Sequence, residues 1–495
     1  AIGALSNAST ALEKAATADL YAVRAYSLAM RALERNEYGH STALLREAIT
    51  MDPGFALARL RLAVILQDNS DSLSEALALL SALDENSRLA QRDRLRLEGV
   101  RANLTLPPVE SISRWRRMAE LYPDDFQAHG QLAYRAWLDA NDLELAVSAV
   151  ERNAVSQNPN AATGHYLRAM LAIAQGDYEV AQARFGLADS AGLVRENEYV
   201  AYLHAARGDL RAATDALAAG RTSGQAISSI GVQLSRALLA ANEGLLDESA
   251  ELLASVATGQ VSTTSGPDDA LRLAIAYLGW VNGKDGPAVS RDLAAAGRGQ
   301  PLAADALPRD RAVAVRRKSA AAWMAARVGD ADLARALLDE IEPGFKDSGW
   351  PELDARIDLA NARLAVLEGD PERAIDLLEP HLDGTEFWLQ RHTLAEALYA
   401  AGRAEDARAQ VEWLVAHRSR AWAEVHGVRV LHLAGVLETR LVRLMAAEAE
   451  QQAGNAAWAK AFLDDFMRDW PNTALPPAIA ARVASLRGDD SDAQG

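Results

Sequence analysis

A short motif recurs along this chain, in which a turn glycine is followed five positions later by an alanine. Clear copies begin at Gly176, Gly208, Gly329, Gly369 and Gly402. Gly176 and Gly208 are 32 residues apart, and Gly369 and Gly402 are 33 apart. A self-similar unit of this length is typical of stacked helical hairpins and not of one globular core. We therefore expect an all-α architecture.

Each unit is predicted to contain helix A, a tight turn, helix B and a short loop that often ends in proline. Small residues should let the two helices approach closely, and on helix B these are Ala181, Ala213, Ala334, Ala374 and Ala407. The turn glycine is expected to take a positive φ, which costs other residues about 1–2 kcal/mol.

Composition supports helices and restricts the classes of partner. Apolar residues make up 49% of the 495 residues but aromatic residues only 6%, and β-branched runs are scarce. The formal net charge of −17 argues against nucleic acid, which requires a basic stripe, and favours basic partners. No stretch approaches 18 uninterrupted apolar residues, so we expect no membrane span in this chain.

The chain contains no cysteine, which excludes disulfides, thiolate chemistry and cysteine-bound zinc. Both cytoplasm and periplasm tolerate such a protein, with the cytoplasm favoured. No signal peptide is recognisable, and the chain opens at Ala1 without methionine. We interpret it as a fragment or processed product, to which an upstream anchor or catalytic domain once belonged.

These motifs resemble the tetratricopeptide repeat (TPR) family over residues 20–475, with eleven or twelve units. The resemblance implies a right-handed superhelical solenoid whose A helices line a concave groove for a protein or peptide. We expect the following parts: a lead-in over 1–19, a first array over 20–222, a second array over 223–475, irregular insertions at 257–268, 284–310, 343–351 and 412–447, and a terminal helix with a disordered tail over 476–495.

The order of segments is similar to a narrower group, the C-terminal TPR regions of bacterial multidomain signalling proteins. The segments that carry this similarity lie at 25–28, 48–58, 93–98 and 121–125. In that group the repeats follow a nucleotide cyclase, a Ser/Thr kinase or a winged-helix regulator. No cyclase or kinase residues occur here, so the resemblance implies only a scaffold or sensor role.

Partner-binding residues are predicted by aligning each unit on its helix-B alanine, because residues three to four apart share one face of helix A. The set consists of Tyr26, Tyr166, Arg195, Glu198, Tyr202, Trp323, Arg327, Arg356, Arg363, His392, Glu396 and Tyr399. Aromatic and Arg side chains are common binding hot spots, although some of these tyrosines are expected only to pack between hairpins. Arg327, Arg356 and Arg363 make the late groove cationic, so we expect an acidic peptide or terminal carboxylate there.

Other chemistry is weakly indicated. The nine histidines form no HExxH motif and no i,i+4 pair, so we expect no metal, cofactor or catalytic residue. One alternative is an enzyme, or half of one, with a site in the irregular 257–350 or 412–447 region. A deep pocket with converging His, Asp or Glu would favour it. Another alternative is a homo-oligomer formed through terminal repeats, whose outward apolar faces need a cap.

Overall fold

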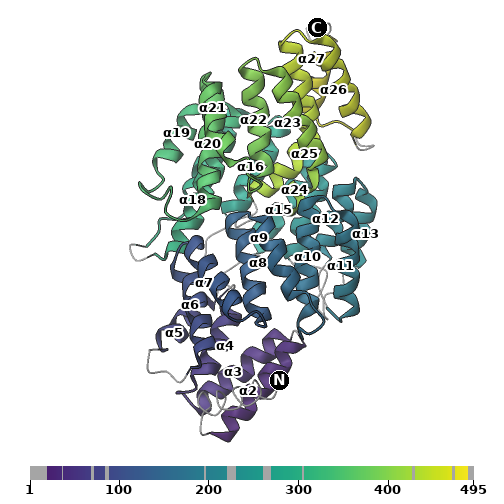
Figure 1. Ribbon diagram of the computed structural model, residues 1–495. Helices are drawn as coiled ribbons and strands as arrows, with labels where there is room; N and C mark the ends of the chain where they lie inside the picture. Colours follow the sequence, from purple (N-terminus) through teal and green to yellow (C-terminus); the bar gives the residue numbers. More distant parts are fainter. Residues whose placement is uncertain are drawn as a thin grey trace. The chain divides into compact units, whose positions relative to one another are not determined.

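The structure is a computed structural model, and it describes residues 19–35, 37–67, 72–83, 89–193, 197–219, 230–259, 269–303, 306–425, 430–470 and 474–488. Within these ranges the regular structure consists of helices, without a strand, which confirms the all-α prediction (Figure 1). No helix among the described residues is long and apolar enough to cross a bilayer.

Contacts divide the chain into two compact units, and each is considered by itself. The first contains residues 1–136, 144–165 and 307–309, and the second contains 137–143, 166–306 and 310–495. This grouping does not follow the two arrays that were expected from the sequence. The helices up to and across the boundary are α2 (Leu20–Glu34), α3 (Tyr38–Met51), α4 (Ala56–Leu66), α5 (Leu73–Ser81), α6 (Gln91–Thr105), α7 (Pro108–Leu121), α8 (Phe126–Ala140), α9 (Leu143–Asn153) and α10 (Ala161–Gln175).

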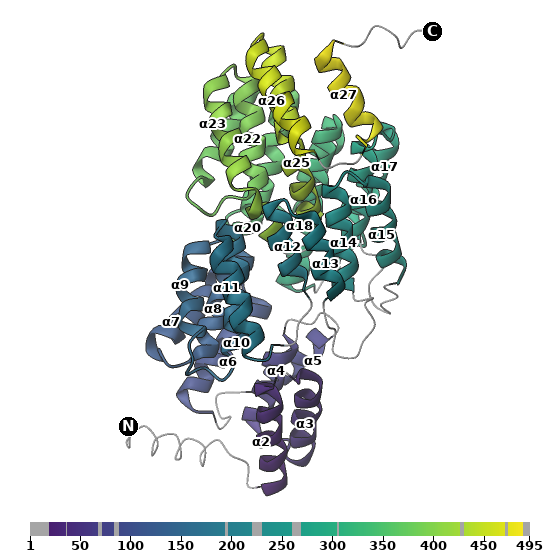
Figure 2. The ribbon, with the colours of Figure 1, turned by 90° about the vertical axis from the view of Figure 1, so that its right-hand side faces the viewer.

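The later helices belong to the second unit (Figure 2). They are α11 (Tyr178–Ser190), α12 (Glu198–Arg207), α13 (Leu210–Ala219), α14 (Ile230–Asn242), α15 (Leu246–Gly259), α16 (Asp269–Val281), α17 (Gly286–Arg298), α18 (Pro308–Val328, from Asp310 on), α19 (Ala331–Asp339), α20 (Pro351–Glu368), α21 (Pro371–Leu378), a 3-10 turn η2 (Glu379–His381), α22 (Trp388–Ala400), α23 (Ala404–Ala416), α24 (Arg418–Ala423), α25 (Val430–Gln452), α26 (Ala456–Asp469) and α27 (Pro477–Arg487).

Consecutive helices pair as hairpins in both units, as the motif predicts. In the first unit, Gly99 on α6 lets the fully buried Trp115 of α7 approach, since a Cβ atom there would lie 2.7 Å from the indole ring. In the second unit the five motif alanines are fully buried. The five motif glycines have φ between 74° and 93°, which confirms the left-handed turn prediction.

The irregular segments contain more helix than expected. Segment 284–310 includes α17, and 412–447 includes α24 and most of α25. Connector 343–351 leads into α20, and α27 follows residue 476. Residues 1–18, 260–268 and 489–495, on which the lead-in, part of an insertion and the tail were placed, lie outside the described residues.

In a solenoid of stacked hairpins each unit contacts only its neighbours, and one helix of this chain departs from that arrangement. α25 is 23 residues long and contacts α14, α16, α22, α23 and α24 besides its own partner α26. In Figure 1, α22, α23 and α25 run side by side. Its buried face includes Leu437, Leu441 and Leu444. Neighbour-only stacking is therefore wrong for the second unit, where a late helix packs on helices from nearly 200 residues earlier.

Candidate functional site

The late part of the predicted groove forms a buried ionic cluster, here called the Glu438 cluster, which consists of Tyr277, Arg327, Arg363, His392, Glu396 and Glu438. Arg327 donates a hydrogen bond from Nη2 to Glu438 Oε1 at 2.8 Å and also pairs with Glu396. The Tyr277 hydroxyl donates a hydrogen bond to Glu438, and His392 Nε2 lies 3.5 Å from Glu438 Oε2. Helix spacing brings these groups together from α16, α18, α20, α22 and α25.

Mutual attraction keeps Glu438 and Arg327 ionised. Burial acts to raise the pKa of Glu438, but Arg327 and His392 outweigh it and hold the pKa at about 2. Burial acts to lower the pKa of Arg327, and its two carboxylate partners raise that pKa well above the ordinary range. The cationic groove residues therefore already bind acidic groups of the same chain: Arg327 binds Glu438 of α25 and Glu396 of α22, and Arg363 lies 3.8 Å from Glu396.

The other predicted residues of the second unit also contact their own chain. The Tyr202 hydroxyl lies 2.9 Å from Ser235 Oγ, and its ring lies 5.6 Å from that of Trp422. Arg356 pairs with Glu352 and lies over the Phe387 ring. Contacts of the remaining residues are similar: Tyr166 packs on Phe185 and Tyr199, Glu198 is buried, Tyr399 donates to Glu450, Trp323 is buried, and Arg195 lies outside the described residues.

In the first unit, Tyr26 lies at one end of a row of polar side chains on α2, α4, α6 and α8, here called the amide track. Its members are Tyr26, Arg61, Gln67, Asn103, Gln127 and Gln131. Tyr26 interacts electrostatically with Arg61, which donates to Gln127 at 2.9 Å. Asn103 donates to Gln67 at 2.8 Å and to Gln131 at 3.3 Å.

The amide track is accessible except at Gln67. Tyr26, Arg61, Asn103, Gln127 and Gln131 are all half-buried, whereas Gln67 is 1% exposed and its Nε2 group has no partner among the described residues. Tyr26 is the only member of the amide track that was predicted from the sequence. The sequence did contain a signal for the other members, because amide side chains are unusual within otherwise apolar A helices. These amides could be recognised as a row only once the helices and their register were known.

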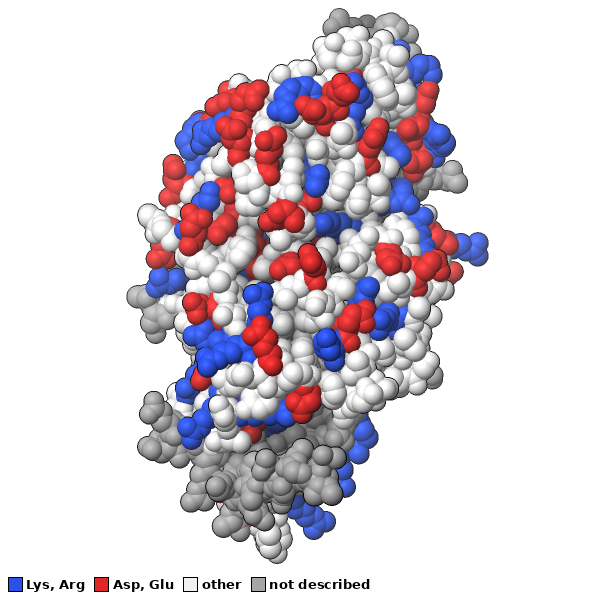
Figure 3. All heavy atoms as spheres, viewed as in Figure 1, with Lys and Arg blue, Asp and Glu red and all other residues white. Residues whose placement is uncertain are grey.

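Charges beside the amide track are balanced. Arg96 pairs with Asp93 and Asp125, and Arg92 Nε donates to Asp125 Oδ2 at 2.6 Å. On the face drawn in Figure 3, acidic and basic side chains of the described residues are interspersed, without a broad area of one sign. The local chemistry is thus suited to a neutral polar ligand and not to a strongly charged one.

A separate cavity of about 280 Å³ lies in the second unit, beside the irregular segment 343–351. Connector residues Lys346 and Asp347 line it together with Asp354, Asp358 and His381. Lys346 Nζ and His381 Nε2 lie 2.5 and 3.0 Å from the two oxygens of Asp358. Burial raises the pKa of Asp354, and the nearby carboxylates Asp347 and Asp358 add to the shift.

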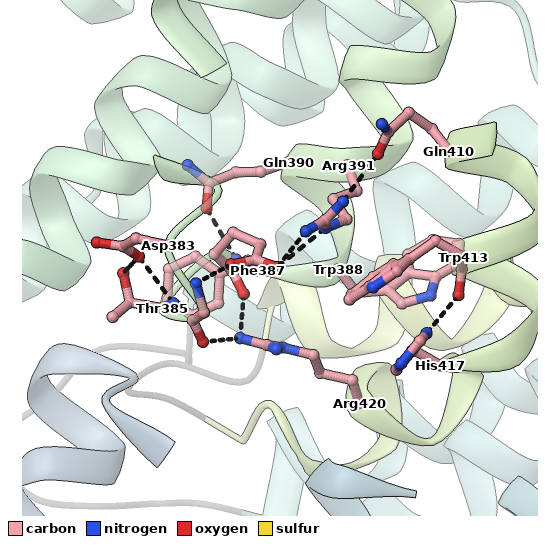
Figure 4. Close-up of polar contacts among 12 residues, drawn as sticks. Asp383, Thr385, Phe387, Trp388, Gln390, Arg391, Gln410, Trp413, His417 and Arg420 are labelled. Atoms are coloured by element: carbon pink, nitrogen blue, oxygen red, sulfur yellow. Dashed lines mark hydrogen bonds and ion pairs between the residues drawn. The ribbon is translucent and has the colours of Figure 1, made fainter. Parts of the chain in front are cut away.

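Residues of the loop 383–387 also line this cavity. Side chains of α22 and α24 hold the loop in place through polar contacts (Figure 4). Arg420 Nη2 donates to the Gly384 and Glu386 carbonyl oxygens, at 2.8 and 2.5 Å. Arg391 donates to Glu386 at 2.9 Å and lies over the Trp413 ring, 4.1 Å from its centre. These interactions give the loop a fixed shape.

The cavity meets only part of the requirement for an enzyme site. It brings His and Asp together, but the nearby hydroxyls bond elsewhere: Thr385 donates to Asp383 and Ser348 to the Phe345 carbonyl. No described hydroxyl is therefore hydrogen-bonded to His381, as a nucleophile and its base would be. No group of three or more metal-ligating side chains occurs among the described residues.

Comparisons with known proteins found no matching family model and no matching curated protein. Three solved structures are similar over most of the chain. They are Naa15/Naa10 bound to HypK-THB (15% identity, TM-score 0.22, covering 95% of this chain and 80% of that one), the P58(IPK) TPR domain (14%, 0.21, 87% and 99%) and yeast Tom70 (12%, 0.21, 95% and 97%). Scores this low carry no argument about partner or activity, so the all-α repeat fold rests on the hairpins themselves.

Proposed function

We propose that this chain is a non-catalytic helical-repeat scaffold that binds an extended peptide along the amide track of the first unit. The observation that carries the proposal is the row of polar side chains, half-buried except at Gln67, that links α4, α6 and α8. A side-chain amide both donates and accepts hydrogen bonds, so it can bind the N–H and C=O groups of a peptide backbone. Tyr26 and Arg61 supply the aromatic and cationic side chains typical of binding anchors.

The amide track favours backbone recognition over charge recognition, because Arg61 lies 3.9 Å from Asp93 and the arginines beside the track are paired. The net charge of −17 would still attract basic segments at long range and speed their association. We do not place the partner in the late groove of the second unit, where carboxylates of α20, α22 and α25 already pair with the arginines. A sensor or scaffold role in a bacterial signalling protein follows only from the sequence resemblance.

The proposal is tested with a random peptide library displayed on phage and selected on the full chain. Selected peptides are labelled, and their affinities are measured by fluorescence anisotropy. The double variant Gln127→Ala/Gln131→Ala should weaken binding at least tenfold, since two amide contacts of about 1 kcal/mol each are lost. Arg114→Ala serves as the control, because Arg114 pairs with Glu110 on α7, outside the track. Equal affinities for the double variant and the wild type would rule the proposal out.

A second candidate function, self-assembly, is supported by the first hairpin. Leu20, Tyr21, Tyr38 and Met51 are exposed there by 81%, 72%, 50% and 40%. Apolar side chains gathered on a terminal repeat commonly mark an interaction surface. Light scattering should then show a concentration-dependent dimer that Tyr21→Glu abolishes. A monomer throughout the micromolar range would exclude this function.

A further inference from the structure

Three arginines converge on one small pocket in the second unit. Arg418 of α24 and Arg440 and Arg443 of α25 line it, together with Asp469 and Trp470 at the end of α26. The space between them is about 30 Å³ and is partly open to solvent, which leaves room for a few water molecules or a small polar group. Neither the amide track nor the Glu438 cluster contributes a lining residue.

Existing contacts fix the guanidinium groups without using all their donors. Arg418 Nε donates to the Ala206 carbonyl at 2.7 Å. Arg440 donates from Nε to Asn242 Oδ1 at 2.9 Å and from Nη1 to the Asp469 carbonyl at 3.1 Å. Each guanidinium has five N–H donors, so several remain for a ligand. Arg418 and Arg440 are thus positioned by backbone and amide oxygens, which do not neutralise their charge.

The charges in the pocket do not balance. Asp469, which pairs with Arg443, is the only carboxylate among the lining residues. Burial and the neighbouring Arg418 lower the pKa of Arg440 to about 10, while Glu243 acts in the opposite direction. Burial also lowers the pKa of Arg443, and Arg418 and Arg468 add to that shift. Three arginines and one aspartate among the lining residues leave two positive charges in excess.

Trp470 adds a donor that has no acceptor. Its side chain is 8% exposed, and its Nε1–H group has no hydrogen-bond partner among the described residues. Gly244 permits this placement, because a Cβ atom there would lie 2.5 Å from Trp470 Cζ2. A buried N–H group without a partner costs about 1–3 kcal/mol, so a bound acceptor would relieve it.

We propose that this pocket binds one phosphate group, through Arg418, Arg440, Arg443 and the Trp470 indole N–H. A phosphate dianion matches the two excess positive charges and only accepts hydrogen bonds from these donors. Its tetrahedral oxygens suit donors that approach from α24, α25 and α26, and planar guanidinium forks bind such oxygens well. This site is independent of the proposed peptide surface, because that surface lies on the other unit.

The test uses the full chain and isothermal titration calorimetry with inorganic phosphate. We expect one phosphate per wild-type chain and at least tenfold weaker binding to Arg443→Gln. Arg468→Gln is the matched control, since Arg468 loses the same charge but pairs with Asp465 outside the pocket. The control should lose much less affinity than Arg443→Gln, because Arg468 acts on the pocket only through its charge and donates no hydrogen bond there. Absence of binding at 10 mM, or equal binding by Arg443→Gln, would overturn the proposal.

Thermal unfolding gives a readout that does not depend on heats of binding. Phosphate should raise the Tm of the wild type and of Arg468→Gln as its concentration rises, since a ligand stabilises the state it binds. Arg443→Gln should be folded by circular dichroism, with a Tm that phosphate leaves unchanged. A parallel titration with O-phosphoserine amide separates a phosphate ester from free phosphate as the preferred form. Equal stabilisation of Arg443→Gln would again overturn the site.

Discussion

Arg327 and Glu438 lie 111 positions apart in the chain and form a buried hydrogen-bonded ion pair of 2.8 Å. Arg327 belongs to α18 and Glu438 to α25, so the pair joins two helices of the second unit that are distant in sequence. Removing one partner of a buried pair leaves an uncompensated charge, which costs far more than the net value of the pair.

Glu438→Ala should therefore lower the free energy of unfolding by about 3–5 kcal/mol, because Arg327 and the Tyr277 hydroxyl lose their acceptor. Chemical denaturation measures the change. Glu448→Gln is the control: Glu448 pairs with Arg482 on partly exposed surface, and its loss should cost less than about 1 kcal/mol. Similar effects for the two variants would mean that the Glu438 cluster does not stabilise the second unit.

The lowered pKa of Glu438 predicts that acid reduces the stability of the folded protein. Its pKa is lowered in the folded state to about 2, so its contribution is present above about pH 4 and disappears as pH falls toward 2. Unfolding free energies measured in this window should fall less steeply for Glu438→Gln than for the wild type. Parallel pH profiles for both proteins would contradict the assignment.

Glu424 should show the opposite pH dependence. Burial raises its pKa to about 7, although Arg420 and the Trp388 N–H group act to lower it. The folded state therefore holds the proton more tightly, and stability falls as pH rises from about 4 to 7. Glu424→Gln keeps an acceptor for Trp388 and should stabilise the protein by about 1–3 kcal/mol at pH 8. A variant less stable than the wild type at pH 8 would refute this.

Two turn glycines form a matched pair for testing close packing. Gly244 and Gly329 both have positive φ, of 81° and 93°, but a Cβ atom on Gly244 would collide with Trp470, whereas one on Gly329 would meet nothing within 4 Å. Gly329→Ala should cost about 1–2 kcal/mol for its backbone alone. Gly244→Ala should cost at least 1 kcal/mol more, measured by thermal unfolding. Equal losses would show that Trp470 does not pack there.

Local features of the repeats were predictable from sequence because they depend on neighbouring residues. A turn glycine such as Gly208 and a closing alanine such as Ala213 have roles that a hairpin defines by itself. Asn141 occupies a turn without the motif glycine, and it takes a positive φ of 53°. Its side-chain amide donates to the Thr385 and Glu386 carbonyls, more than 240 residues later. A contact over this distance could not be predicted from the local motif.

The position of α25 could not be predicted in this way. Aromatic and Arg side chains on helix A indicate a surface that binds something, but they do not say whether the bound group belongs to another molecule. Arg327, His392 and Tyr399 bind Glu438 and Glu450 of the same chain. The Arg418, Arg440 and Arg443 pocket is equally hidden in sequence, because its members come together only when α24 and α25 pack.

The late position of α25 also has a consequence for synthesis on the ribosome. α14 and α16 cannot complete their buried surface until residues 430–452 have emerged, nearly 200 residues after α14. Contacts between such distant segments slow folding and leave apolar surface open meanwhile. During translation the second unit should therefore be a client for chaperones, whereas the early hairpins α2–α3 and α4–α5 close as soon as they are made.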